Sequence, residues 1–301
     1  MYLHKQSSVD SIEKLRLFIQ KNCHSQEMFD LIQLNHSLLG LFDKNSLEWR
    51  QQYYRNSVQQ QFIIELAKNP LLTNKFVVLK GMCFSDYGIY QNLGERLTSD
   101  IDLLVEDIDF FAKVLEDLQF NLVTNHKWRG NDYKKIYAKT ISGVEVIVEL
   151  HARIFYHVKS DSLKVTQSLH GYNILKIEDL LLHLVGHLGF QHTFLKLHWL
   201  LDIQLLLNQF GETLDWKRFE TLIEDYQLEN SWKFTCHFLN LVFHDIKPQS
   251  FLLNYLISSK FILFPEKEKF RYYILKNLLK DRVGTSFTYS FWWVLEKGWK
   301  K

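Results

Sequence analysis

The sequence predicts an α+β protein in which a small mixed β-sheet core is flanked by an N-terminal and a C-terminal helical region. Two observations support this. Apolar residues recur in steps of three and four at both ends of the chain, whereas short β-type runs separated by turn residues fill the middle. The 301 residues, 47% of them hydrophobic, can bury a large core. We therefore expect a helical region at 1–70, an α/β core at 71–158 and a helical domain at 159–301.

The N-terminal region is predicted to be helical from about residue 8 to residue 69. Ile12, Leu15 and Phe18 follow the spacing of one helix face, and similar spacing returns after residue 28. Pro70 ends this pattern. We find no catalytic motif in this region.

The predicted core begins with a short apolar strand at 76–79, closed by Lys80 and Gly81. The order continues as helix, strand, helix and then a meander of strands, with turns at 130–132 and 142–143. The helices are expected at 82–91 and 107–118, and the later strands at 100–105, 120–124, 133–139 and 144–155. This order predicts a mixed sheet with helices on one face.

The C-terminal region returns to helical spacing after residue 177. Its candidate helices are 177–188, 195–208, 216–226, 231–243 and 251–261.

Composition limits the classes of function. The net charge of +2 does not suggest a broad nucleic-acid-binding surface, although it allows a local basic cleft. The three cysteines, Cys23, Cys83 and Cys236, lie far apart and predict neither a disulfide framework nor a zinc site. With no signal-peptide pattern and no uninterrupted apolar run of about 20 residues, we expect a cytoplasmic protein that does not span a membrane.

The most informative motif is an Asp-x-Asp pair at the start of the second predicted strand. Side chains alternate along a strand, so Asp100 and Asp102 share one face while Ile101 and Leu103 face the core. Two neighbouring carboxylates repel one another unless a positive charge lies between them. Magnesium prefers such oxygen ligands, and two ions about 4 Å apart serve phosphoryl transfer.

A third acid is available on the strand at 144–151. Glu145, Glu149 and His151 share one face of it. Glu149 lies deeper in the apolar run and is the preferred metal ligand, with Glu145 as the alternative. His151 could support the ligands from beside them or be a polar residue at a strand end.

An Asp-x-Asp motif alone is often an exposed strand edge. A metal site is favoured over an exposed edge by three other features: the turn formed by Lys80 and Gly81, the nearby Arg96 and the later Glu149. Arg96 could neutralise phosphate or steady Asp100, or be a surface arginine.

His183 and His187 lie four residues apart on one predicted helix face, a spacing that zinc ligands also use. No third ligand is evident, and the Glu of a metalloprotease motif is absent. We expect histidines of the core or the lining of a cleft.

These motifs resemble the polymerase-beta-type nucleotidyltransferase superfamily, and most closely an uncharacterised bacterial branch of it. The resemblance covers about residues 70–210. It rests on the runs 77–81, 99–105 and 149–153, on Tyr90 and Arg96, and, less specifically, on His183, His187, Trp199 and 201–203.

The resemblance implies transfer of an NMP group from an NTP such as ATP to a hydroxyl group, with two magnesium ions, or manganese in their place. Asp100, Asp102 and Glu149 would hold the metal and carry catalysis. The superfamily's usual Gly-Ser turn is here Lys80–Gly81: the glycine permits a close backbone approach to the nucleotide, and the lysine offers a charge for phosphate.

Other expectations depend on the same resemblance. Arg96 and Ser85 are further nucleotide-binding candidates, although Ser85 could equally lie on a solvated helix face. The acceptor could be a small molecule, a protein side chain or an RNA end.

Two alternative functions remain open. One is a catalytically inactive nucleotide-binding or regulatory module. The other is a toxin-like tRNA nucleotidyltransferase, for which the basic segment at 260–282 with its interleaved aromatic residues would bind RNA. A solvated basic helix is the commoner structure for such a segment.

Overall fold

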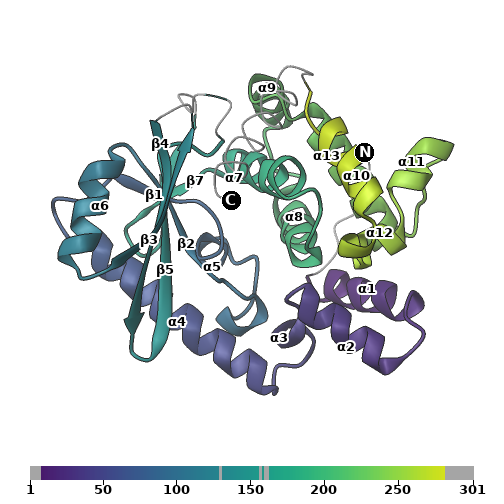
Figure 1. The fold of residues 1–301 in the computed structure, drawn as a ribbon, viewed down its shortest axis with the longest axis horizontal. Coiled ribbons are helices and arrows are strands. Elements are labelled where there is room, and N and C mark those ends of the chain that lie inside the picture. Colours follow the sequence, from purple (N-terminus) through teal and green to yellow (C-terminus); the bar gives the residue numbers. More distant parts are fainter. Residues whose placement is uncertain (1–7, 129–130, 156–157, 159–162, 282–301) are drawn as a thin grey trace, which may run out of the picture.

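The computed structural model describes residues 8–128, 131–155, 158 and 163–281, and it confirms an α/β arrangement built on one mixed sheet (Figure 1). The described part of the sheet has seven strands in the order β3-β4-β5-β2-β1-β7-β6. Their bounds are β1 (Phe76–Val78), β2 (Ile101–Val105), β3 (Asn121–Trp128), β4 (Asn131–Ile141), β5 (Val144–His151), β6 (Val165–Gln167) and β7 (Asn173–Leu175).

Parallel and antiparallel pairs alternate around the centre of the sheet. β2 is antiparallel to β1 and parallel to β5, and β1 is parallel to β7. The last two strands lie in the segment 159–176, which we assigned to the C-terminal helical domain without predicting an element there. Each has three residues, which is too short for an alternating pattern to be recognised.

Helices lie on both sides of the sheet, because the helices of the C-terminal region lie opposite the core helix α6 (Ile108–Asp117) (Figure 1). Helix α6 packs on one face and is capped by Asp107, whose carboxylate accepts hydrogen bonds from the backbone N–H groups of Asp109 and Phe110. In Figure 1, α6 lies left of the sheet, while α7 (Ile177–Val185) and α8 (Leu197–Phe210) lie to its right.

The N-terminal region forms helices as expected, and the first of them packs against α8 and α10 (Glu229–His244). The helices are α1 (Ser8–Lys21), α2 (Gln26–Asn35), α3 (Leu39–Phe42) and α4 (Leu47–Ala67). In the core, the helix expected at 82–91 is shorter than predicted. α5 (Cys83–Asp86) ends before Gly88, whose φ of +63° is incompatible with continued helix, and a short 3-10 turn, η1, follows at Leu93–Glu95.

The C-terminal region is also helical, with two departures from the predicted pattern. The helix expected at 177–188 changes after α7 into a π-helical segment, η2 (Gly186–Gln191). The helix expected at 251–261 is broken near Ser258, which caps the second piece. The elements after α8 are α9 (Trp216–Asp225), α10 (Glu229–His244), α11 (Phe251–Leu256), α12 (Ser259–Leu263), η3 (Pro265–Lys267) and α13 (Lys269–Leu278).

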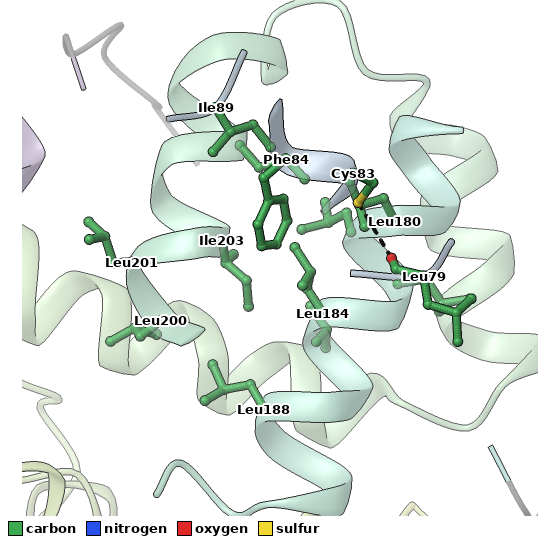
Figure 2. Close-up of a cluster of buried hydrophobic side chains, with 14 of the residues drawn as sticks. Leu79, Cys83, Phe84, Ile89, Leu180, Leu184, Leu188, Leu200, Leu201 and Ile203 are labelled. Atoms are coloured by element: carbon green, nitrogen blue, oxygen red, sulfur yellow. Dashed lines mark hydrogen bonds between the residues drawn. The ribbon is translucent and has the colours of Figure 1, made fainter. Parts of the chain in front are cut away.

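The sheet and the helical region share one hydrophobic core. Figure 2 shows Leu180, Leu184 and Leu188, spaced by four residues along α7 and η2, together with Leu79 and Phe84 from the β1–α5 segment. All of these side chains are buried. Because burial of each such side chain stabilises the fold by about 1.5–3 kcal/mol, the two halves are held firmly against each other.

Within the described ranges, none of the helices combines the length and the apolar composition that crossing a lipid bilayer requires.

Candidate active site

A cavity of about 490 Å³ lies between the sheet and the helices α7 and α8. Its volume is in the range of pockets that bind small molecules and cofactors. The sheet side contributes Asp100, Asp102, Lys134, Glu149 and His151, and the Lys80–Gly81 turn and Arg96 also line it. The helical side contributes His183, His187, Gln191, His192, Lys196, His198 and Trp199.

Strand pairing brings the acids together. In the parallel pair of β2 and β5, Asp102 lies opposite Glu149 and Leu104 lies opposite His151, so the polar side chains share the face toward the cavity. Leu103 lies opposite Leu150 on the other face, and both are buried. The alternation expected for the Asp-x-Asp segment is therefore confirmed at Asp102.

Asp100 and Asp102 differ in environment. Asp100 directly precedes β2, and 23% of its side chain is exposed. Asp102 is almost completely buried. Glu145, the alternative third acid, is exposed at the opposite end of β5 and does not line the cavity, whereas Glu149 does.

Positive groups lie directly against these carboxylates. The Lys80 ammonium contacts Asp102 Oδ2 and lies 3.7 Å from Asp100 Oδ1. His151 Nε2 is 3.1 Å from Asp102 Oδ1 and 3.4 Å from Glu149 Oε2. Lys134, on β4, contacts Glu149. The repulsion among the acids is thus offset by two lysines and an imidazole.

This arrangement sets the protonation of the central pair. Burial raises the pKa of Asp102, but Lys80 and His151 outweigh that effect and hold the pKa well below its ordinary value. Burial lowers the pKa of Lys80, but Asp102 and Asp100 more than reverse this. The pKa of Asp100 is raised, first by burial and then by the charge of Asp102. Asp102 and Lys80 are therefore charged at neutral pH.

The same cluster could hold a divalent cation. Ligand atoms of Asp102, Glu149 and His151 lie within 4.8 Å of one another. Carboxylate oxygens fit magnesium or manganese, and the imidazole adds a nitrogen donor. The sequence-based set had Asp100 in place of His151; Asp100 lines the same cavity beside this group.

The Lys80–Gly81 turn has the geometry that glycine permits. Gly81 has a φ of +67°, and a Cβ atom at this position would lie 2.7 Å from Thr98 Cγ2. The turn lies beside the acids because the N–H of Leu79 donates to the carbonyl oxygen of Asp102. A side chain at position 81 would therefore displace the segment that carries Asp100.

The other nucleotide-binding candidates lie in two different places. Arg96 borders the cavity, but its guanidinium is bound by Asp202 of α8, with Nε–Oδ1 at 2.9 Å and Nη2–Oδ2 at 2.8 Å. Ser85 lines a separate cavity of about 130 Å³, and its hydroxyl donates to the carbonyl oxygen of Met82. The structure does not bring Ser85 to the carboxylates.

His183 and His187 both line the main cavity, and His151 touches two of the acids directly. Sequence reasoning missed Lys134, His192 and the role of Asp202. Lys134 lies opposite His151 in the register of β4 and β5, and the sequence alone does not show that register. No sequence signal links Arg96 to Asp202, which is 106 residues away.

The basic C-terminal segment is partly engaged within the protein. Lys260 and Arg271 both form ion pairs with Glu268, and Lys280 is buried. Phe270 and Tyr273 are exposed. Arg282, the last residue of the predicted RNA-binding segment, lies outside the described residues.

Comparison with known proteins supports the chemistry that this geometry suggests. Residues 39–244 match the family model described as uncharacterised nucleotidyltransferase. Comparisons with curated proteins and with solved structures gave no significant match. The matched region contains the acids, the Lys80–Gly81 turn and the histidines of the helical side. The chain therefore belongs to this family of uncharacterised nucleotidyltransferases.

Proposed function

We propose that the protein transfers an NMP group from an NTP to a hydroxyl group of an acceptor, with Asp100, Asp102 and Glu149 as the acids that hold two magnesium ions. The observation that carries this proposal is the register of β2 and β5. It sets Asp102 beside Glu149 at the wall of a cavity that Asp100 also borders.

The metal would supply charge neutralisation for the phosphates and activation of the attacking hydroxyl. The acids suit this role because they are already gathered in one place and Asp102 is ionised. The folded protein therefore already holds the negative charges close together before a metal ion binds. His151 would steady Asp102 and Glu149 from the side, since its Nε2 lies within 3.4 Å of both.

Lys80 would bind the triphosphate. Its ammonium is held next to the acids by a flexible side chain, so it could turn from Asp102 to a phosphate oxygen when a cation occupies the acid cluster. In the transfer, the acceptor oxygen bonds to the α-phosphorus, the bond to the β-phosphate oxygen breaks, and pyrophosphate leaves. The hydroxyl proton passes to solvent in the open cavity.

Transfer of label from NTPs tests this proposal. The protein is incubated with magnesium, cell extract and NTPs labelled on either the α- or the γ-phosphate. We expect the α-label alone to enter product, because nucleotidyl transfer keeps the α-phosphate and releases the others. Asp102→Asn and Glu149→Gln should each reduce transfer by at least ~100-fold, since the metal contributes several kcal/mol.

Asp109→Asn is the matched control. Asp109 is an exposed acid of α6 that pairs with Lys135 outside the cavity, so transfer should be unchanged. Transfer of the γ-label would indicate a kinase instead. Binding of NTP without transfer would favour the inactive-module alternative, and an absence of both would overturn any NTP-dependent function.

A further inference from the structure

The helical side of the cavity is a cluster of aromatic rings. The ring centroids of His187 and Trp199 lie 4.7 Å apart, as do those of His192 and Trp199, and His187 and His192 are 4.4 Å apart. His183 adjoins this group, with its ring centroid 6.1 Å from that of His187. We call these four residues the aromatic wall.

The backbone that carries the wall is unusual. The π-helical segment η2 contains His187 and leads directly into His192. The next two residues, Thr193 and Phe194, have positive φ values of 50° and 60°. Non-glycine residues in this conformation cost free energy, and π-helical turns and such strain occur frequently at functional sites.

Local packing supports this path of the chain. A Cβ atom at Gly186 would lie 2.1 Å from the Phe155 ring, so the start of η2 approaches that ring as only glycine allows. The helix therefore does not simply fray after α7. It is held in a form that directs His187 and His192 to the cavity.

His183 provides an independent observation that points to a ligand. It is 3% exposed and lines the cavity, yet neither of its ring nitrogens has a hydrogen-bond partner in the described structure. A buried polar group without a partner is destabilising. The nitrogens have almost no accessible surface, so a ligand with hydrogen-bonding ring atoms that displaced a neighbouring side chain would supply what His183 lacks.

The wall is also uncharged. Burial lowers the pKa of His183 to about 3 and that of His192 to about 4, and it holds the pKa of His187 well below its ordinary value. A neutral imidazole offers one donor and one acceptor. The opposite wall, with Lys80 and the acids, is charged. The cavity thus suits a molecule with a charged end and a flat, neutral, heteroaromatic end.

We propose that the aromatic wall of His183, His187, His192 and Trp199 binds the nucleobase of the NTP, by stacking and by hydrogen bonds from His183. This inference rests on the proposed function, which places the triphosphate at the acids. A metal site is a poorer explanation for these histidines. Among the described residues, the ligand atoms close enough to share an ion are those of Asp102, Glu149 and His151.

Binding measurements can separate the base from the phosphates. Dissociation constants are measured calorimetrically for the four NTPs and for tripolyphosphate, each with magnesium. The wild-type protein should bind at least one NTP about tenfold or more tightly than tripolyphosphate, because stacking of one base on an aromatic residue contributes that much. His183→Phe and Trp199→Leu should remove most of this preference and leave tripolyphosphate binding unchanged.

Two further measurements distinguish a loss of NTP binding from a loss of the folded structure. His183→Phe removes the unpartnered nitrogens, so its melting temperature should equal or exceed that of the wild type while NTP binding weakens. Trp216→Leu is the matched control for Trp199→Leu, since Trp216 packs against Phe219 and Trp232. It should keep the wild-type preference for the NTP.

The outcomes distinguish the two proposals. If neither NTPs nor tripolyphosphate bind the wild-type protein, both proposals are overturned. If both bind equally, or if the His183 and Trp199 variants keep the preference for the NTP, only the nucleobase site is overturned. The same holds if these variants raise KM for the acceptor alone, since the wall would then bind the acceptor.

Discussion

Two buried aspartates in this protein, Asp102 and Asp202, have the same side chain but different partners. Asp202 is fully buried, and its oxygens are bound by Arg96 and by the hydroxyl of Tyr90 at 2.7 Å. Asp102 is also buried, but its oxygens meet the ammonium of Lys80 and the imidazole of His151 at the wall of a cavity.

The difference separates a permanent contact from an exchangeable one. The planar guanidinium of Arg96 binds both oxygens of Asp202 in a fixed geometry and remains charged at any accessible pH. The single ammonium of Lys80 is carried on a flexible chain and can be replaced by another cation. Asp202 therefore fastens the segment before β2 to α8, whereas in our proposal Asp102 exchanges its contact with Lys80 for one with a metal ion.

The largest expected effect concerns stability. Asp202→Asn should lower the free energy of unfolding by about 3–5 kcal/mol, because it leaves the buried Arg96 without its counter-charge. Asp102→Asn should cost less, about 1–2 kcal/mol, since Asp100 still faces Lys80 and a buried hydrogen bond is replaced rather than lost. Urea denaturation measures both values. Equal losses of unfolding free energy in the two variants would contradict the difference between a permanent and an exchangeable contact.

The next effect concerns cations. Magnesium or manganese should raise the melting temperature of the wild type and of Asp202→Asn, but not that of Asp102→Asn, because only Asp102 belongs to the acid cluster. Lys80→Met should bind the cation about tenfold more tightly, since the competing ammonium is removed. A cation response that survives in Asp102→Asn would contradict this assignment.

The smallest effect concerns pH. The pKa of Asp102 is lowered on folding, so its ion pair stabilises the protein at pH values above its ordinary pKa of 3.8 and loses this contribution as the pH falls below that value. The difference in the free energy of unfolding between wild type and Asp102→Asn should shrink as the pH falls below about 4. Urea titrations at each pH provide the measurement. A difference that grows below about pH 4 would contradict the assigned shift.

The sequence predicted the parts of the site that depend on local pattern. The spacing of Asp100 and Asp102 indicates a shared orientation within one strand, and the apolar run around Glu149 indicates its depth. The contacts of His151, Lys134 and Lys80 depend on strand register and on the crossover between β2 and β5, which no single segment encodes.

The helical side shows the same limit. The spacing of His183 and His187 predicted a shared helix face, and both residues do line the cavity. A π-helical turn leads into His192, and at its start Gly186 approaches the Phe155 ring as only glycine allows, a contact that the local sequence does not reveal. Likewise, Arg96 resembles a phosphate ligand in sequence because its partner, Asp202, lies on a distant helix.

The position of β7 has a consequence for how the chain can be divided. β1 pairs with β2 on one side and with β7, almost 100 residues later, on the other. A fragment that stopped at residue 158 would keep every acid of the site yet leave β1 as an open edge, prone to pairing with another molecule. During synthesis, β1 likewise cannot pair with β7 until residues 173–175 have been made. Until then its edge is exposed, so this order of strands favours aggregation during folding.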